Sequence, residues 1–562
     1  MAFHPVAAAV LGWIAPGMLL IPGMVARMSP ARIFRLGYLA GLVHHLAALV
    51  WLLWNPFPAG AFAGWFALSA YLALYPATWA WLCERLAVAA DVSRRKSPPE
   101  PPIASAAPNR SRESCADCTS AATASWPLRA LWGFGCAALW VGFEMLRARL
   151  FTGFPWNPLG SSQVENLPLI QFTAFTGVYG VSFLLVWTSA SGLLAGLRFR
   201  AALVESGSLP GGRAGSRHPS RRGRGSLVGT GLSRLLPDLF LPALAVAGVL
   251  AYGGSRLLSP EEPAGRGMLR VALVQPAIPQ RLIFDPAESS RRFEDLLALT
   301  DRALATHPDL LVWPEAALPS LSEDDYRRLY DRVHTGGAWM VFGADDTAPN
   351  PDATGGYDWF NAAFLLDPTG TLQASYRKQQ LVIFGEYVPL ARWLPWLERL
   401  TPVSSSFARG SGPAAFRLSD PPASCAPLIC YEDVFPRVAR RAVAADTDFL
   451  LNLTNDAWFG ETAEHWQHLA CATFRAVENG VPLVRCANNG ISGWVTPRGA
   501  WRELGFGPGT RVYDRGFKTV EIPLRLPGRA PTFYTRHGDL FGWLCSALGG
   551  VFAALTFWPR PR

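Results

Sequence analysis

Charged residues are scarce in this chain of 562 residues: Asp, Glu, Lys and Arg together make up only 17% of it. Half of the residues are hydrophobic, and Trp and Phe occur 22 and 32 times. This balance is too apolar for an ordinary soluble protein and indicates membrane-spanning segments. The chain also lacks a glycine-rich phosphate-binding loop and a dinucleotide-binding fingerprint, so we predict no nucleotide cofactor.

Cysteine is sparse too, with nine copies. Cys115 and Cys118 form a C-x-x-C pair without a second pair or a histidine partner, which argues against a structural zinc site. His465 and His468 lie three residues apart but have no third ligand at a suitable spacing, so we expect them to pack or to form hydrogen bonds. We therefore predict no metal. Six cysteines are interpreted as core residues: Cys83, Cys136, Cys425, Cys471, Cys486 and Cys545.

The apolar residues are gathered into long stretches, each close to the ~20 residues that cross a bilayer as a helix. No Lys or Arg precedes the first stretch and no A-x-A cleavage site follows it, so we interpret it as a retained span and not as a signal peptide. The seven predicted spans are residues 5–26, 35–54, 60–82, 129–147, 170–197, 236–255 and 540–558.

Basic residues are concentrated in every second connection between these spans. The loop 55–59 has no Lys or Arg, and the loop 148–169 has only Arg149. This alternation is the positive-inside pattern, so we interpret the arginines as cytoplasmic topology signals and predict no nucleic-acid partner. Two basic connections, near 88–126 and 198–235, are rich in Gly, Ser and Pro and are predicted to be flexible linkers. The basic residues are Arg27, Arg32 and Arg35; Arg94, Arg95, Lys96, Arg110 and Arg112; and Arg198, Arg200, Arg213, Arg217, Arg221, Arg222, Arg224 and Arg234.

The alternation places an extramembrane domain, residues 256–539, outside the cytoplasm. It follows a transmembrane region, residues 1–255, and precedes a last span with a short cytoplasmic tail, residues 540–562. Short apolar runs typical of strands alternate there with helical patterns at 286–306 and 321–335, which predicts an α/β layered domain. The expected strands lie within residues 269–276, 309–319, 338–344, 361–370, 425–432, 448–456 and 481–490.

An acid, a base and a thiol follow expected strands, where loops expose side chains for chemistry. Glu315 follows a strand that ends in Trp-Pro, Lys378 lies upstream of a second acid, Glu386, and Cys430 ends another strand. A carboxylate can take the proton of a thiol, and a lysine cation favours the thiolate and stabilises an oxyanion. The pattern is typical of a nucleophilic site.

The motifs around these residues carry a family resemblance. The stretches "VWPEAALP", "YRKQQLVIFGEYVP", "LICYEDVFP" and "LNLTNDAWFG" together resemble the carbon–nitrogen hydrolase (nitrilase) superfamily and its Glu-Lys-Cys triad. The stretches "GFPWNPLG", "GVYGVSFL", "NDAWFGETAEHWQH", "ANNGISG" and "FYTRHGD" are similar to one family within it, the apolipoprotein N-acyltransferases. The resemblance covers nearly the whole chain.

The resemblance implies a nitrilase-like αββα sandwich on a multi-pass transmembrane helical bundle in the bacterial inner membrane, with the catalytic domain on the periplasmic side. It implies a monomer that moves an acyl chain from a phospholipid to the α-amino group of a diacylglyceryl-modified N-terminal cysteine of a lipoprotein, through a thioester and without a cofactor. It also implies catalytic roles for Glu315, Lys378 and Cys430, with four supporting residues: Glu386, Tyr431, Glu432 and Asn361. For Glu386 and Glu432, a structural ion pair or cap is the alternative, and Asn361 has a structural alternative too.

Two other functions fit parts of the pattern. One is a membrane-tethered amidase that uses the same triad on small amides, and the other is a catalytically silent lipoprotein-binding or export factor. The chain also departs from the family at three positions, with Gln380 for a His, Ile383 for a Pro and Phe284 for a Trp. The family has eight transmembrane helices where seven are expected here, and the first span resembles the family's second.

Overall fold

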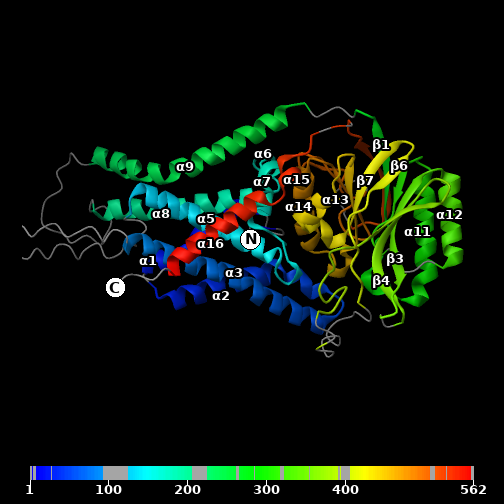
Figure 1. The fold of residues 1–562 in the computed structure, drawn as a ribbon, viewed down its shortest axis with the longest axis horizontal. Coiled ribbons are helices and arrows are strands. Elements are labelled where there is room, and N and C mark those ends of the chain that lie inside the picture. Colours follow the sequence, from blue (N-terminus) through cyan, green and yellow to red (C-terminus); the bar gives the residue numbers. More distant parts are fainter. Residues whose placement is uncertain are drawn as a thin grey trace, which may run out of the picture.

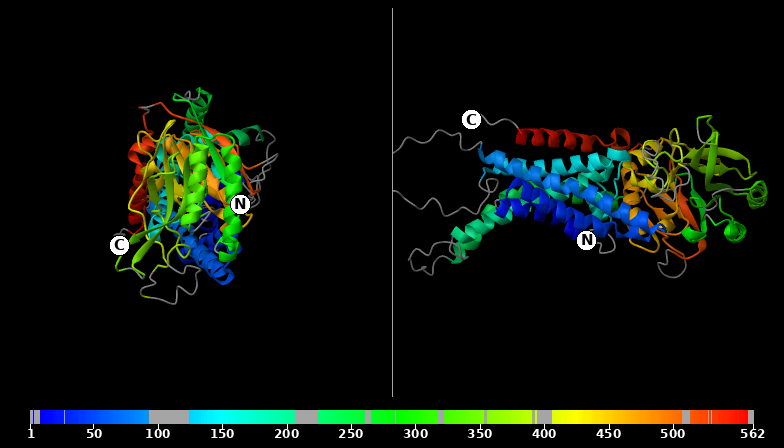
Figure 2. Two further views of the ribbon diagram at one scale, coloured as in Figure 1. Left: turned by 90° about the vertical axis from the view of Figure 1, so that its right-hand side faces the viewer. Right: turned by 90° about the horizontal axis from the view of Figure 1, so that it is seen from below.

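The computed structural model describes residues 8–26, 28–92, 124–205, 224–260, 265–283, 285–316, 322–352, 355–389, 406–506, 513–526 and 530–557, together with Phe3, Trp393 and Gly528. The molecule is elongated, with a bundle of helices at one end and a layered α/β part at the other (Figure 1). The views in Figure 2 show the same division.

The bundle consists of long helices from the first half of the chain and one helix from its C-terminal end (Figure 1). Small residues allow close packing: a Cβ atom on Gly37 would lie 3.0 Å from Cα of Ala77, and one on Gly41 would lie 3.1 Å from Cα of Ala73. The long helices are α1 (Ala15–Ala26), α2 (Pro30–Ala48), α3 (Pro58–Val92), α5 (Trp126–Arg147), α8 (Val178–Glu205), α9 (Arg224–Leu258) and α16 (Leu540–Phe557).

Within the described residues, four helices are long and apolar enough to cross a membrane: Pro58–Ala87, Val178–Val204, Leu236–Leu258 and Leu540–Phe557. The other three predicted spans also contain helices, but α1 has only 12 residues and α2 and α5 carry charged side chains. The fold is thus a membrane helical part joined to an α/β domain, as predicted, although four helices meet the length-and-composition criterion and not seven.

The predicted boundaries around α8 and α9 were wrong. The stretch before α8 is divided into the short helices α6 (Leu167–Ile170) and α7 (Thr173–Thr176), so the span predicted from residue 170 begins at Val178. The linker predicted at 198–235 is partly helical, because α8 continues to Glu205 and α9 begins at Arg224. Arg129 and Arg198 pair with the buried Asp238 at 2.7 and 2.6 Å, which fixes α5 and α8 against α9. The remaining parts of both predicted linkers lie outside the described residues.

Two six-stranded sheets form the α/β part within the described residues. In the first sheet the order is β12-β1-β2-β3-β4-β5, with β1, β2 and β3 parallel. These strands are β1 (Met268–Gln275), β2 (Leu310–Val312), β3 (Trp339–Pro349), β4 (Tyr357–Leu366), β5 (Leu372–Arg377) and β12 (Gly516–Pro523).

The second sheet has the order β11-β10-β9-β8-β7-β6, with β7, β8 and β9 parallel. Strands β8 and β9 are buried along their whole length, as expected for parallel strands covered on both faces. The strands are β6 (Phe416–Ser419), β7 (Pro422–Ile429), β8 (Phe449–Thr454), β9 (Leu483–Ala487), β10 (Gly493–Val495) and β11 (Trp501–Arg502).

The sheets face each other across a core that includes Leu273, Val312, Phe449 and Val484. Helices α11 (Ser289–Leu304) and α12 (Glu323–Gly336) cover the outer face of the first sheet. Helices α13 (Pro436–Ala442) and α14 (Glu464–Asn479) cover the second sheet and lie between it and the bundle (Figure 1). The predicted αββα sandwich therefore meets the bundle through its α13–α14 layer.

Candidate active site

The predicted site residues come together where parallel strands of both sheets end. Glu315 follows β2 of the first sheet, and Cys430 follows β7 of the second. Asn361 lies in β4, and Lys378 directly follows β5. Gly343 of β3 leaves room for the segment after β2, since a Cβ there would lie 2.9 Å from Cα of Glu315. The topology thus brings four separate segments to one edge of the sandwich.

A buried cluster of two acids, a lysine and an amide forms the centre of the site. The Nζ atom of Lys378 lies 3.1 Å from Oε1 of Glu315 and 2.7 Å from Oε1 of Glu386. The side-chain amide of Asn361 donates to the same two oxygens, at 2.8 and 2.9 Å. Burial alone would lower the pKa of Lys378, but the charges of Glu315 and Glu386 raise it well above its usual value. The lysine is therefore a permanent cation between two carboxylates.

The second carboxylate oxygen of Glu315 is held from the other sheet. Its Oε2 accepts a hydrogen bond of 3.0 Å from the backbone N–H of Asn455, just after β8. Asn455 is itself fixed, because its side chain donates to Gln280 at 2.9 Å and accepts from Asn488 at 3.0 Å. Sequence analysis did not assign Asn455 a role, although it stands in the "NDAWFG" motif directly after a strand, and that position was the available signal.

Cys430 begins a short 3₁₀ turn (Cys430–Val434) in a left-handed conformation, with φ of 52°. The side-chain amide of Asn452 fixes the turn by donating to the Cys430 carbonyl at 2.9 Å. Non-glycine residues rarely adopt this conformation. The instances that do occur cluster at functional sites. Cys430 is half-buried, and the charges of Glu315 and Lys378 affect the pKa of its thiol.

The expected effect of Lys378 on the pKa of the Cys430 thiol is present, but other effects outweigh it. Burial and the charge of Glu315 raise the pKa of the thiol well above its usual value, and the opposing effect of Lys378 is smaller. The resting residue is thus a protonated thiol and not the preformed thiolate that a nearby lysine alone would favour. Such a thiol needs a base at the moment of attack, and Glu315 is the carboxylate whose charge affects it most.

Glu432 fixes the backbone on both sides of the site. Its Oε1 accepts from the backbone N–H groups of Gln379 and Gln380, at 2.7 and 3.0 Å. Its Oε2 accepts from the hydroxyl of Tyr376 and from the backbone N–H of Ile429, both at 2.8 Å. This buried carboxylate therefore joins the segment that contains Lys378 to the turn that begins with Cys430.

Tyr431 connects the cysteine turn to the membrane bundle. Its ring lies 6.2 Å from that of Phe154 and 6.3 Å from that of Trp156, both in the loop after α5. Gln380 makes a second connection, since its amide donates to the Thr152 carbonyl at 3.1 Å and accepts from Arg437 at 2.9 Å. The site therefore lies next to the junction with the bundle. Ile383 forms an isolated β-bridge with Tyr387, and Phe284 lies outside the described residues.

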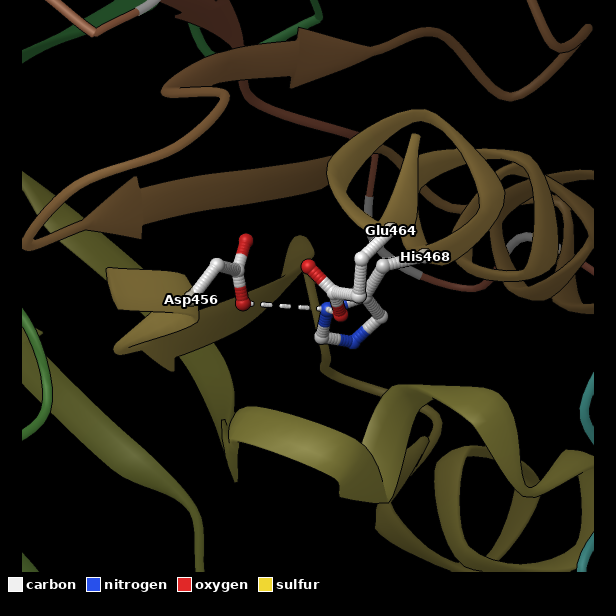
Figure 3. A group of neighbouring side chains, drawn as sticks. All are labelled: Asp456, Glu464 and His468. Atoms are coloured by element: carbon white, nitrogen blue, oxygen red, sulfur yellow. Dashed lines mark hydrogen bonds and ion pairs between the residues drawn. The ribbon is translucent and has the colours of Figure 1, made fainter. Parts of the chain in front are cut away.

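Within the described residues, the cysteines interpreted as core residues lie as predicted, and the two histidines form the expected hydrogen bonds. The expectation that no third ligand group lies near them was wrong, because Asp456 and Glu464 lie beside His468. The six cysteines interpreted as core residues are all buried, and Cys115 and Cys118 lie outside the described part of the chain. Nδ1 of His468 lies 3.2 Å from Asp456 (Figure 3). Its Nε2 lies 2.7 Å from Asp433, so both ring nitrogens face carboxylates. His465 lies 2.5 Å from the Gly460 carbonyl through Nε2.

Family models match both parts of this architecture. The family model described as "Carbon-nitrogen hydrolase" matches residues 270–513, and the one described as "Apolipoprotein N-acyltransferase N-terminal domain" matches residues 1–191. Among solved structures, an amidase of the nitrilase superfamily from Nesterenkonia AN1 is 22% identical with a TM-score of 0.34, covering 50% of this chain and 95% of that chain. The α/β part is a nitrilase-fold domain of the carbon–nitrogen hydrolase superfamily, attached to a membrane helical part.

Relatives that match most of the chain identify the family within this superfamily. The chain is 34% identical over 557 residues to the apolipoprotein N-acyltransferase of Geobacter metallireducens, covering 97% of this chain and 91% of the relative. It is 35% identical over 386 residues to that of Brucella suis, covering 66% of this chain and 65% of the relative. The chain belongs to the apolipoprotein N-acyltransferase family, and is a bacterial membrane acyltransferase.

Proposed function

We propose that the protein transfers an acyl chain from a membrane phospholipid to the α-amino group of a diacylglyceryl-modified N-terminal cysteine of an apolipoprotein, through a thioester on Cys430. One observation carries this proposal: the cluster of Glu315, Lys378, Glu386 and Asn361 lies beside a half-buried thiol whose turn packs against the membrane bundle. A lipid ester that stays in the membrane can reach a nucleophile at such a junction.

In the first step, the sulfur of Cys430 attacks the ester carbonyl carbon of the phospholipid. The S–C bond forms as the thiol proton passes to Glu315, which supplies the base that a protonated thiol requires. Lys378 offers a fixed positive charge to the oxyanion of the tetrahedral intermediate. The C–O bond then breaks, Glu315 returns the proton to the departing oxygen, and a lysophospholipid leaves.

In the second step, the α-amino nitrogen of the apolipoprotein attacks the thioester carbonyl carbon. The C–N bond forms, a proton passes from the amine to Glu315, the C–S bond breaks, and the proton returns to the sulfur of Cys430. Both steps use only side chains of the chain itself, so the proposed chemistry includes no cofactor or metal. Asn361 and Glu386 hold Glu315 and Lys378 in place, and Glu432 fixes the cysteine turn.

We also propose that the protein acts as a monomer in the bacterial inner membrane, with residues 256–539 as the catalytic domain on the periplasmic side and no nucleic-acid partner. The alternating arginine-rich connections support this orientation. The domain boundaries follow from the same pattern, with the transmembrane region at 1–255 and the last span and tail at 540–562.

Mass spectrometry of a lipoprotein N-terminus tests this function. In cells with wild-type protein as the only copy, we expect a triacylated N-terminal cysteine, whereas cells with Cys430→Ala should yield only the diacylated form. Purified wild-type protein should also trap a phospholipid-derived acyl group on Cys430. Ammonia release from small amides, without a trapped acyl group, would instead support the membrane-tethered amidase.

A further inference from the structure

A buried ionic network lies behind the cysteine turn, and the proposed reaction does not use it directly. The guanidinium of Arg485 on β9 lies 2.6 Å from Asp433 and 3.2 Å from Asp456. His468 on α14 bridges the same two acids, with its ring nitrogens 2.7 Å from Asp433 and 3.2 Å from Asp456. All four side chains are at most 2% exposed. Two cations and two anions thus form a closed ring.

The two acids of this ring belong to the two segments that carry the reacting groups. Asp433 is the fourth residue of the turn that begins with Cys430. Asp456 follows Asn455, whose backbone N–H holds Glu315 at 3.0 Å. His468 and Arg485 therefore join the nucleophile turn to the loop that binds the proposed base.

The same region offers a carboxylate-rich group that resembles a metal site. One ligand atom each from Asp456, Glu464 and His468 lies within 4.8 Å of the others (Figure 3). However, the guanidinium of Arg485 reaches Asp456 and also lies 3.3 Å from Nδ1 of His468. Since the protein supplies its own cation there, we interpret the group as part of an ionic network.

The network keeps its charges at neutral pH. Burial alone would lower the pKa of His468, but Asp433 and Asp456 raise it to about 10. The side chain of His468 is therefore a positively charged imidazolium. Burial would raise the pKa of Asp456, but His468, His465 and Arg485 hold it well below its usual value. The neighbouring Glu464 has a pKa of about 7, raised by burial and by Asp456, and it faces His465 and His468.

This charge balance reaches the nucleophile. The groups that act on the Cys430 thiol are Glu315, Lys378, Asp456 and Glu386, and Arg485 interacts with the same thiol. A full charge left uncompensated behind the turn would change the thiol's ionisation, because charges act strongly through a poorly polarisable interior.

We propose that His468 is a positioning residue that, as a cation shared by Asp433 and Asp456, locks the Cys430 turn to the Glu315-binding loop and sets the ionisation of the Cys430 thiol. The proposal rests on the proposed function, in that Cys430 is the nucleophile. It predicts that the number of charges in the network, and not only its shape, controls the reactivity of the thiol.

The test measures the rate of Cys430 alkylation by iodoacetamide at pH 8 in the full-length protein in detergent micelles, by mass spectrometry of the peptide that contains Cys430. His468→Gln removes a positive charge, so it should slow alkylation about three- to tenfold. Asp456→Asn removes a negative charge and should accelerate alkylation by a similar factor, since one pKa unit corresponds to tenfold in thiolate.

Three further variants separate charge from packing. His468→Lys keeps the cation and should stay within about twofold of wild type. The double variant His468→Gln/Asp456→Asn restores neutrality and should return the rate toward wild type, even if its thermal stability is lower. His334→Gln makes the same substitution on the exposed end of α12 and should change nothing.

Shifts of equal sign in His468→Gln and Asp456→Asn, or no shift in either, would overturn the proposal. A different measurement would show that the proposed function itself is wrong. If Cys430→Ala still triacylated lipoproteins, the acyl-transfer mechanism would fall, whereas the opposite shifts in alkylation rate would still show whether the network controls the thiol.

Discussion

The side chain of Glu478, at the end of α14, accepts a hydrogen bond of 2.9 Å from the backbone N–H of Val178, the first residue of the membrane helix α8. Arg475, one turn earlier, donates to the same oxygen at 2.9 Å. The α/β domain thus caps a helix of the bundle with a buried ion pair. This contact is one of those that join the α13–α14 layer to the membrane part.

Glu478→Ala should therefore loosen the junction. The change leaves the buried Arg475 without its carboxylate and the start of α8 without its acceptor, which we expect to destabilise the protein by about 3 kcal/mol. Thermal unfolding in detergent measures this as a lowered Tm. Glu323→Ala on the exposed start of α12 is the matched control, because its 3.9 Å ion pair with Arg327 lies in solvent. Equal stability of the two variants would mean that the cap does not hold the domains together.

Variants at Lys378 distinguish a catalytic role of this residue from a structural one. Lys378→Met should reduce acyl transfer by at least about 100-fold, because it removes the charge offered to the oxyanion. It should also lower the Tm, since Glu315 and Glu386 then face each other without their cation. The double variant Lys378→Met/Glu386→Gln removes that repulsion, and we expect it to regain stability but not activity. Recovery of activity together with stability would reduce Lys378 to a structural ion-pair partner.

Asp345 provides a pH-dependent prediction at the edge of the site. It pairs with Asn361 across β3 and β4, and burial together with the charges of Glu315 and Glu386 raises its pKa to about 7. A carboxyl whose folded-state pKa is raised contributes stability that is complete below its unfolded pKa of about 3.9 and is lost as the pH rises through 7. Asp345→Asn removes this loss, so it should stabilise the protein at pH 8, by about 2 kcal/mol, and not at pH 4. Chemical unfolding at both pH values measures the difference, and a stabilisation of equal size at pH 4 would contradict it.

Most of the site could be predicted from the sequence because its groups stand in motifs at strand ends. The side chains of Lys378 and Asn361 each donate hydrogen bonds to Glu315 and Glu386, so the four residues lie together as expected. The network of Asp433, His468 and Arg485 could not be predicted, since its members come from a turn, a helix and a strand far apart in the chain. Local patterns do not report a contact that the packing of two sheets and a helix layer creates.

The fold, too, could be predicted from the sequence only in part. The buried parallel strands β1, β7, β8 and β9 were predicted from continuous apolar runs, whereas the sequence pattern did not indicate β5, β6, β10, β11 or β12. Strand β12 is mostly half-exposed and pairs antiparallel with β1, where Gly516 is the partner of Gln275, 241 residues earlier in the chain. Tertiary pairing, and not a hydrophobic pattern, therefore defines this strand. Helix ends in the basic connections were wrong because polar residues continue a helix beyond the membrane core.

Orientation in the membrane is open to a direct test. An alkaline phosphatase reporter fused after residue 256 should be active, because the arginine-rich connections keep the other side of α9 in the cytoplasm. A fusion at residue 215 should be inactive, and a β-galactosidase reporter should give the opposite pattern at both points. Reversed activities would overturn the orientation and, with it, the proposed substrates.

The last prediction concerns two cysteines that share one segment. Cys430 and Cys425 are five residues apart, but Cys430 is half-buried at the end of β7 whereas Cys425 is fully buried within it. Burial and Asp448 raise the pKa of Cys425 far above its usual value, with no opposing lysine among the causes, whereas Lys378 partly offsets the same effect at Cys430. A lipid-like electrophile at neutral pH should therefore label Cys430 and leave Cys425 unmodified.

Prior incubation with phospholipid should protect Cys430 from this label, because the sulfur would then be held as a thioester. Lys378→Met should slow the labelling, since it removes a cation that favours the thiolate while Glu315, Asp456 and Glu386 still disfavour it. Peptide mass spectrometry reads both cysteines in one digest, so Cys425 serves as the internal control. Equal labelling of the two cysteines without lipid protection would show that Cys430 is only an accessible thiol, and the acyl-enzyme mechanism would then fail at its first step.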